Sequence, residues 1–325
     1  INKLLPRADF FAFETSQLAA SDNPNLSKRF MLLNGDWKFQ WVRSPKDRLK
    51  DFHEVNLDDT NWSTIPVPAN WEVEGYGHPI YLDERYPFTT TWPDAPEDYN
   101  PVGTYRHWFN LDEGWLKDEV ILHFAGAKSA MYLYVNGTFV GYSQGSKTPA
   151  EFNVSSFVHK GENLIAIQMY RWSDASYLES QDMLRMSGIE REVYLYAKPQ
   201  VSIEDLKVIA DLDENYENGV LNVDVKIKNK LDQPVERLLQ LSLHDTDLSI
   251  FEYQKSVIID GDSIKRFNLS EVFQDIKHWS AGTPTLYRLN IQLIDPSNPH
   301  NSQFIAKNIG FRNVRIENSQ LLVNG

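Results

Sequence analysis

The chain has 325 residues, so we expect two domains, with a single large sandwich as the alternative. Its net charge of −13 argues against nucleic acid as a partner, because a phosphate backbone requires a basic face. No segment approaches the run of about 18 apolar residues that a membrane helix requires, so we expect no membrane partner. The absence of cysteine removes disulfides and thiolate sites and suits a cytoplasmic location, with a periplasmic or secreted protein as the alternative.

The first third of the chain is predicted to hold one strand among turns and loops. Aromatic and polar residues alternate over 37–41, which is typical of a strand with one buried face. Five prolines between residues 75 and 101 disfavour central strand pairing, so we expect a surface loop there. The remaining segments are expected to be an extended lead-in over 1–30, a turn at 34–36, a short helix over 44–52 and an irregular stretch over 60–71.

The middle of the chain is predicted to consist of short strands. Asn136-Gly137 lies between two of them, and this pair is typical of a type I′ hairpin turn. Many short strands with little helical periodicity indicate an all-β jelly-roll sandwich. The expected strands cover 103–110, 120–124, 131–135, 138–142, 162–170 and 192–196.

The last third of the chain shows a plainer alternation. Apolar residues at every second position from Leu221 to Ile227 indicate a strand with one face in water. About seven such strands follow residue 200, which is the size of an immunoglobulin-like sandwich. Tryptophan is concentrated before residue 173, which supports a boundary near residue 198. We therefore assign the lead-in to 1–30, the jelly roll to 31–198, the immunoglobulin-like sandwich to 199–314 and a further element to 315–325.

The connection over residues 170–188 is long for two strands and rich in aromatic residues, so we expect an ordered binding loop. Its carboxylates are Asp174, Glu179 and Asp182. They could bind a cation, accept hydrogen bonds from sugar hydroxyls, or pair with the two arginines of the loop, and salt bridging or solvation is the commoner fate of a surface charge. We select Asp182 as the functional candidate, because a carboxylate accepts from two hydroxyls and binds hard cations, with Glu179 as its supporting residue.

Outside this loop, few residues indicate chemistry. Asn100 precedes a proline and is by spacing alone a turn residue more often than a binding residue. Trp37, Trp41 and Trp108 lie on alternating strands and are expected in the core, whereas Trp92 is expected to be exposed and could stack on a sugar. Signatures of serine hydrolases, phosphate-binding loops, dinucleotide folds and zinc proteases are absent, so the residues offer no complete catalytic set.

Residues 177–189, Tyr-Leu-Glu-Ser-Gln-Asp-Met-Leu-Arg-Met-Ser-Gly-Ile, resemble a loop in the first domain of glycoside hydrolase family 2 β-galactosidases. The resemblance extends along the chain, because other segments match the family in the same order. These segments are 32–39, 66–71, 78–81, 100–103, 279–287, 309–312 and 322–325.

The resemblance implies a jelly roll, an immunoglobulin-like sandwich and a catalytic (β/α)8 barrel that begins near residues 315–325. The family holds its catalytic glutamates in the barrel, so we expect no catalytic residue here. The sequence ends on Asn324-Gly325, a hairpin turn that lacks a return strand, and we therefore expect a fragment. The parent would be a retaining β-galactosidase that hydrolyses terminal non-reducing β-D-galactose residues, and the fragment would be inactive alone.

The resemblance also implies roles for single residues. Asp182 would bind Na⁺ that contacts the galactose 6-hydroxyl, and Asn100 would hydrogen-bond the sugar. Gln144 and Asp174 match positions near a structural Mg²⁺. No organic cofactor is expected. The partners would be a β-galactoside, the chain's own barrel and, in the full-length enzyme, further copies of itself.

Two alternatives remain open. The chain could be a non-catalytic carbohydrate-binding or scaffold module, which would be expected to end on a completed element. The parent could instead be another family 2 hydrolase, such as a β-glucuronidase or a mannosidase. The carboxylate of Asp182 would repel the C6 carboxylate of a glucuronide, which favours a galactoside.

Overall fold

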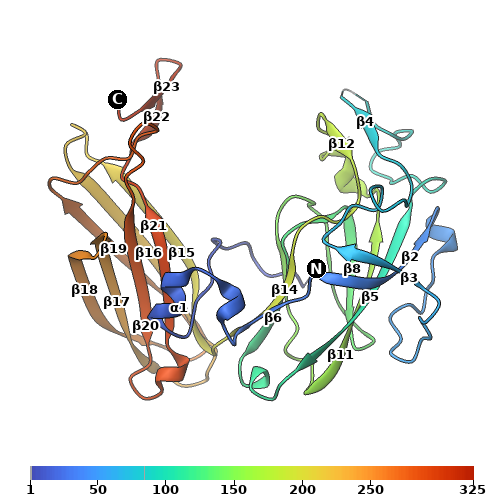
Figure 1. Ribbon diagram of the computed structural model, residues 1–325, viewed down its shortest axis with the longest axis horizontal. Coiled ribbons are helices and arrows are strands. Elements are labelled where there is room, and N and C mark those ends of the chain that lie inside the picture. The colour runs from blue at the N-terminus through green and yellow to red at the C-terminus, as the bar shows by residue number, and fades with distance from the viewer. Residues whose placement is uncertain (1, 84) are drawn as a thin grey trace. The chain divides into compact units, whose positions relative to one another are not determined.

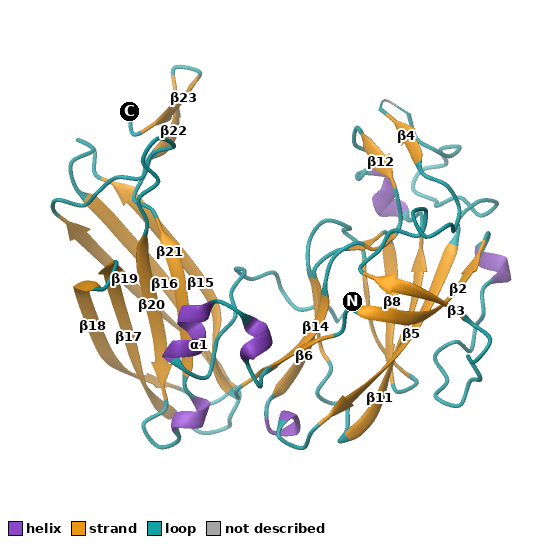
Figure 2. Ribbon diagram, in the orientation of Figure 1, coloured by secondary structure: helices purple, strands orange, loops and turns teal. Residues whose placement is uncertain are grey.

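The computed structural model describes residues 2–83 and 85–325, and strands dominate it (Figures 1 and 2). The chain forms two compact units. The first unit holds Arg29–Lys198 and the residues up to Pro6, and the second holds Arg7–Lys28 and Pro199–Gly325. The structure therefore confirms the all-β fold class, a jelly roll followed by an immunoglobulin-like sandwich. Within the described residues, no helix has the length and apolar character needed to cross a membrane.

The first unit is a sandwich of a six-stranded and a four-stranded antiparallel sheet. The six-stranded sheet runs in the order β3 (Ser63–Val67), β2 (Gly35–Val42), β5 (Val102–Leu111), β11 (Gly161–Tyr170), β8 (Ala130–Val135) and β9 (Thr138–Ser143). The four-stranded sheet runs in the order β1 (Phe30–Leu32), β14 (Val193–Lys198), β6 (Glu119–Phe124) and β10 (Ala150–Asn153).

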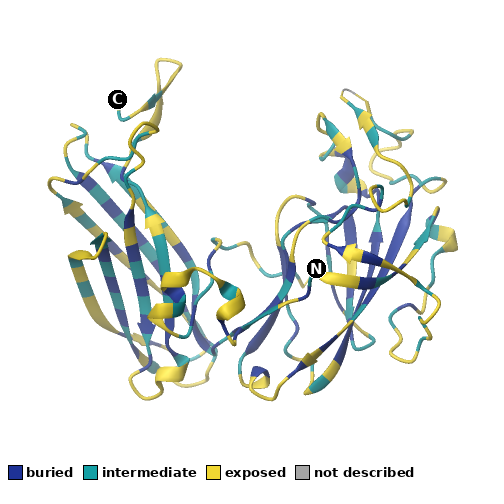
Figure 3. Cartoon of the chain, in the orientation of Figure 1, coloured by how far each residue is buried: buried dark blue, intermediate teal, exposed yellow. Residues whose placement is uncertain are grey.

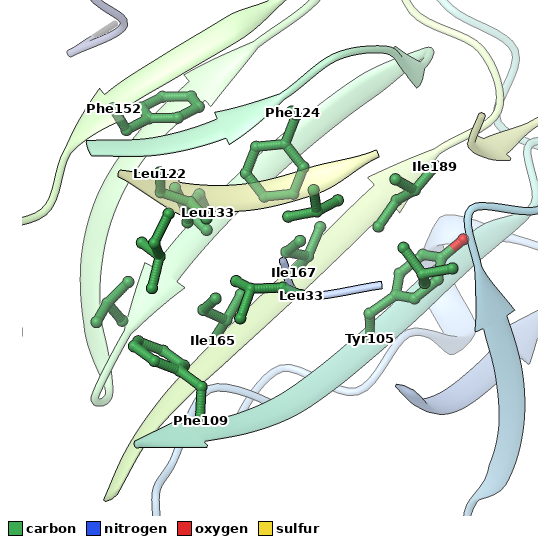
Figure 4. Close-up of a cluster of buried hydrophobic side chains, with 14 of the residues drawn as sticks. Leu33, Tyr105, Phe109, Leu122, Phe124, Leu133, Phe152, Ile165, Ile167 and Ile189 are labelled. Atoms are coloured by element: carbon green, nitrogen blue, oxygen red, sulfur yellow. The ribbon is translucent and has the colours of Figure 1, made fainter. Parts of the chain in front are cut away.

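One hydrophobic core joins these two sheets. Leu122 and Phe124 of β6 share an interior with Leu133 of β8 and with Ile165 and Ile167 of β11 (Figure 4). All five side chains are fully buried. Removing each such side chain from water contributes about 1.5–3 kcal/mol, so this core fixes the strand ends from which the long loops leave.

The second unit follows the expected alternation. Leu221, Val223, Val225 and Ile227 are buried on β16, and the residues between them are partly exposed (Figure 3). One sheet runs β15 (Val201–Leu212), β16 (Gly219–Asn229) and β19 (Ser263–Phe273). The other runs β18 (Leu248–Ile259), β17 (Val235–Asp245), β20 (Tyr287–Ile294) and β21 (Gln303–Ile309).

The Asn136-Gly137 hairpin is confirmed. Both residues have positive φ angles, 49° and 82°, as a type I′ turn requires. The stretch expected to be irregular over 60–71 instead contains β3, and Pro66 fits there because β3 is an edge strand. The helix expected over 44–52 is reduced to a single 3₁₀ turn, Pro45–Asp47.

The N-terminal lead-in contains a helix that periodicity did not reveal. The helix α1 (Ser16–Ser21) is capped at its N-terminus by Thr15, whose side chain accepts a hydrogen bond from the N–H of Leu18. Next to it, Phe13 forms a bridge with Phe304 of β21. This short helix is held by tertiary packing, because six residues are too few for a stable isolated helix.

At the end of the chain, Asn324 and Gly325 have positive φ angles, 55° and 74°, as the predicted turn requires, and the expected return strand beyond them stays a prediction. β22 (Val314–Glu317) pairs with β23 (Gln320–Val323) through a turn at Asn318-Ser319. The last apolar run is therefore itself a return strand. Asn324 then donates a hydrogen bond from Nδ2 to the carbonyl of Trp279.

Gly103 of β5 provides a test of packing in the first unit. A Cβ at this position would lie 2.7 Å from Cε2 of Trp71 and 2.9 Å from Cε2 of Phe39. Both rings are fully buried, so they have little room to move. We expect Gly103→Ala to lower the free energy of unfolding of this unit by about 3 kcal/mol in urea titrations followed by tryptophan fluorescence.

Gly114→Ala is the matched control. Its φ angle is −58° and no atom lies within 4 Å of the added Cβ, so we expect a change within about 0.5 kcal/mol. Equal effects of the two substitutions would contradict the packing argument.

Candidate functional site

A buried ion pair holds both ends of the long connection after β11. Nη1 of Arg171 lies 3.4 Å from Oε1 of Glu72, and each side chain is 1% exposed. Nη2 of Arg171 donates to the carbonyls of His78 (3.1 Å) and Arg185 (2.8 Å). Burial raises the pKa of Glu72, and this rise is opposed by the N–H of Ser187, which donates to Oε2 at 2.9 Å. The start and end of the connection are therefore tied to one buried centre.

Asn100 supports the same connection from a neighbouring loop. Its Nδ2 donates to the carbonyl of Trp172 at 3.0 Å, and its Oδ1 accepts from the N–H of Trp172 at 2.8 Å. The side chain is 3% exposed. The nitrogen Nδ2 can donate one more hydrogen bond, because it has two hydrogens, and Oδ1 can accept one more, because it has two lone pairs. The structure thus gives Asn100 an anchoring role, and its contact with a sugar stays a prediction.

An aromatic cluster joins the proline-rich loop to the connection. The rings of Trp92 and Tyr177 stack with centroids 3.9 Å apart, and Phe88 meets Tyr177 edge-on at 5.4 Å. The Tyr177 hydroxyl donates to the carbonyl of Asp94 and accepts from the N–H of Thr91. Trp92 is 60% exposed, as expected from the sequence. It therefore presents an aromatic surface beside the loop.

Two tryptophans differ in part from the expectation of core packing. Trp37 is fully buried, as expected. Trp41 is only partly buried and packs against the core edge. Trp108 is 36% exposed, because its position on β5 faces away from the opposing sheet. The alternation in the sequence predicted that all three tryptophans lie in the core. The register of β5 instead places Trp108 on the outer face of the sheet.

Asp182 lies at the exposed tip of the connection, directly before β12 (Met183–Arg185). β12 pairs with β4 (Ile80–Leu82), and this pairing places Tyr81 opposite Leu184. The Tyr81 hydroxyl donates to Oδ1 of Asp182 at 2.7 Å, and this bond raises the pKa of Tyr81. The site predicted at Asp182 is therefore an exposed carboxylate paired with a phenol.

The other two carboxylates of the connection have separate surroundings. Glu179 accepts from the N–H and the hydroxyl of Ser146, each at 2.7 Å, and so ties the connection to the loop after β9. Asp174 is exposed and accepts from the N–H of Ala175. In the described part of the chain, no ion pair joins Asp174, Glu179 or Asp182 to the two arginines of the connection, which instead donate to carbonyls. The salt-bridge alternative is therefore not realised.

Gln144 and Asp174 both act on one phenol. The Tyr142 hydroxyl donates to Oε1 of Gln144 at 2.6 Å. Burial, then the neighbouring Tyr132 and the charge of Asp174 raise the pKa of Tyr142 to about 12. The hydrogen bond of Gln144 and the charge of Asp174 thus both bear on Tyr142, and a shared Mg²⁺ site stays a prediction.

The oxygen atoms of Asp182, Gln144 and Asp174 are suitable ligands for the Na⁺ and Mg²⁺ that the resemblance implies, but they supply only part of each ligand set. Over residues 2–83 and 85–325, no three His, Cys, Asp or Glu side chains gather closely enough to hold a metal. Asp182 offers one carboxylate for Na⁺, and Gln144 with Asp174 offers two oxygen donors for Mg²⁺. Carbonyl and carboxylate oxygens are the ligands that hard cations prefer, so the remaining ligands would have to come from water or from other protein segments.

The comparisons with known proteins bear on the whole chain. The family model described as "Glycosyl hydrolases family 2, sugar binding domain" matches residues 30–199, and the model described as "Glycosyl hydrolases family 2" matches residues 201–312. The chain belongs to glycoside hydrolase family 2. In this family 2 chain, the loops around Asp182 and Asn100 lie within the sugar-binding domain.

Relatives of this family 2 chain include a β-galactosidase from Priestia megaterium (strain DSM 319 / IMG 1521), 35% identical over 331 residues, with 100% of this chain and 32% of the relative covered. Among solved structures, a β-glucuronidase from Bacteroides uniformis matches with a TM-score of 0.72 at 20% identity over 91% of this chain and 34% of its own. A β-glycosidase from Bacteroides vulgatus matches with a TM-score of 0.67 at 20% identity, over 91% and 36%. The structural matches show a shared fold, and the chain spans about a third of each of these relatives.

Sequence reasoning missed Tyr81 and Glu72. Tyr81 lies in a run of strand-forming residues, Ile80-Tyr81-Leu82, which was the available signal, but the prolines around it favoured a loop. The pairing of β4 with β12 is made across about a hundred residues and leaves no local pattern. Nothing in the sequence around Glu72 indicated that it would be buried. Buried glutamates are rare, and this one is explained only by its ion pair with Arg171.

Glu72 provides a test through pH dependence. Its pKa is raised above the ordinary value of 4.5, so between 4.5 and the raised pKa the folded state keeps a proton that the unfolded state has lost. Its contribution to stability therefore falls as pH rises through that window. We expect the free energy of unfolding of the wild type, relative to Glu72→Gln, to decrease with rising pH above 4.5 in urea titrations.

Glu72→Gln resembles the protonated carboxyl group, so we expect the difference in unfolding free energy to shift in favour of this variant as pH rises from 4 to 7. A difference between the two proteins that stays constant from pH 4 to pH 7 would contradict the assigned titration of Glu72.

Proposed function

We propose that this chain forms the sugar-binding and immunoglobulin-like domains of a retaining β-galactosidase that removes terminal non-reducing β-D-galactose. The observation that carries the proposal is the 35% identity to a β-galactosidase across the full length of this chain. The exposed carboxylate of Asp182 at the tip of a rigidly anchored loop supports it. A loop fixed at both ends can hold a polar group in place for recognition at little entropic cost.

In the proposed reaction, this chain binds and orients the sugar. Retaining hydrolysis requires two carboxyl groups about 5 Å apart, one as acid and base and one as nucleophile. We assign these groups to a catalytic barrel outside this chain. Asp182 would accept a hydrogen bond from a galactose hydroxyl, and Na⁺ bound at its carboxylate would supply a positive charge for the 6-hydroxyl.

The chemistry of Asp182 also selects among β-glycosides. A glucuronide carries a carboxylate at C6, and a second carboxylate facing it would be repelled. The phenol of Tyr81 is committed to Asp182 and adds no positive charge. A neutral galactoside therefore suits this surface better than a glucuronide, although family 2 relatives include both specificities by name.

Asp182→Asn tests the role of the carboxylate in the longer protein that carries this chain. The substitution keeps the shape and the hydrogen bond from Tyr81 but removes the charge. We expect kcat/KM for nitrophenyl β-galactoside to fall about 10- to 100-fold, since hydrogen bonds to charged groups contribute about 1.5–3 kcal/mol. The dependence of the rate on Na⁺ concentration is expected to weaken as well.

Asp58→Asn is the matched control, because Asp58 is a carboxylate of the same unit whose bonds go to Thr60. We expect unchanged kinetics for this variant. Unchanged kinetics for Asp182→Asn across a sodium titration would overturn the assignment, and faster cleavage of nitrophenyl β-glucuronide than of the galactoside would overturn the proposed substrate.

The isolated 325-residue chain gives a second test. We expect it to fold with a cooperative unfolding transition and to show no hydrolysis of nitrophenyl β-galactoside above the uncatalysed rate, because the two carboxyls lie outside it. Turnover by the pure chain, abolished by a substitution within it, would contradict the assignment of catalysis to another domain.

A further inference from the structure

The outward face of the four-stranded sheet in the second unit is a recess lined by polar side chains. One cavity of about 650 Å³ lies over β17, β18 and β20, and its lining includes Gln240, Gln254 and Gln292. A second cavity of about 370 Å³ shares Gln292 and extends to α1 and Phe304. Cavities of about 300–1,000 Å³ are the size of small-ligand sites. The two cavities also share His244 and Asn290, so they form one continuous groove.

The register of the sheet arranges the groove in rows. Gln254, Gln240, Gln292 and Phe304 are successive neighbours across β18, β17, β20 and β21. With strands about 4.8 Å apart, this row is about 14 Å long. Along β17, the neighbours of Gln240 on the strand include Leu241, which is buried in the core, so the row lies on the outward face of the sheet. A linear ligand could therefore contact several groups in a single row.

The amides of this row retain hydrogen-bonding capacity. Nε2 of Gln240 donates to Oε1 of Gln254 at 3.3 Å, which leaves Oε1 of Gln240 and Nε2 of Gln254 available. The backbone of Gln292 pairs with both neighbouring strands, whereas its side-chain amide has no hydrogen-bond partner among the described residues. Each of these amides offers a hydrogen-bond donor beside an acceptor. A sugar hydroxyl can likewise both donate and accept, so the two groups are complementary. Gln240 and Gln292 are half-buried, so these two side chains would lose little further hydration when a ligand binds.

The charge and shape of the groove indicate its ligand. The row of Gln254, Gln240 and Gln292 carries no charge, and the charged residues Glu252, Asp247 and Arg288 line the groove outside that row. The chain's net charge of −13 opposes anionic ligands. Phe304, partly exposed at one end of the row, offers an aromatic surface for the CH face of a pyranose ring. We propose that this groove binds a neutral oligosaccharide.

The proposal does not rest on the proposed function. It concerns only the immunoglobulin-like unit, and it would stand even if the chain served another family 2 activity. A neutral oligosaccharide is favoured over a protein partner because the groove offers paired amides and few aromatic rings, among them those of Tyr253 and Phe304, whereas protein interfaces bury a more apolar centre.

The test is binding of defined oligosaccharides to the 325-residue chain by isothermal titration calorimetry. The probes are galactotetraose, xylotetraose and mannotetraose, with tetragalacturonate as the anionic counterpart. We expect at least one neutral tetrasaccharide to bind with a Kd below about 1 mM, and tetragalacturonate to bind more weakly. Double substitution of Gln240→Ala and Gln292→Ala is expected to weaken binding at least about tenfold, since two hydrogen bonds are lost.

Asn268→Ala is the matched control, because Asn268 is an exposed amide on β19 of the other sheet. We expect its binding to equal that of the wild type, and all variants to keep the wild-type unfolding midpoint. The proposal is overturned if no neutral probe binds, if the double variant binds as the wild type does, or if sedimentation shows that a second copy of the chain occupies this face. Hydrolysis assays on the Asp182 variants report on the proposed function alone, so the two can fail separately.

Discussion

The buried pair of Arg171 and Glu72 is the interaction on which the arrangement of the first unit's loops depends. Two charges are removed from water, and their mutual attraction alone would not offset that cost. Hydrogen bonds offset part of this desolvation cost. The guanidinium donates to the carbonyls of His78 and Arg185, and the carboxylate accepts from the N–H of Ser187. One buried centre thereby joins both ends of the connection to the segment 72–78, which is far from it in sequence.

That centre explains why the tip of the connection can be exposed yet ordered. Asn100 holds the backbone of Trp172 near the start, and Glu179 holds the loop after β9 through Ser146. Between Glu179 and Arg185, whose carbonyl accepts from Arg171, the chain presents Asp182 to solvent beside Tyr81. Recognition groups are commonly carried on loops that a rigid scaffold positions, and here polar anchors extend the scaffold beyond the strand ends.

The two units differ in where they expose their polar side chains. In the second unit, regular alternation buries one face of each long strand and leaves an outward face of polar and charged side chains. In the first unit, the central strand β11 is buried along almost its whole length, and the loops rather than the sheet faces carry exposed polar groups. A sugar-binding role in the first unit therefore rests on loop geometry, whereas the groove of the second unit rests on strand register.

The sequence by itself determined the all-β class, the type I′ turn at Asn136-Gly137 and the exposed position of Trp92, because periodicity, turn chemistry and proline content act over a few neighbouring residues. The sequence also selected Asp182 as the functional candidate among the loop carboxylates, and that role stays a prediction. Only the tertiary structure decided the pairing of β4 with β12, the partner of Glu72 and the outward position of Trp108. Those features depend on contacts across long stretches of chain and on which side of a sheet a residue falls, and neither leaves a local pattern.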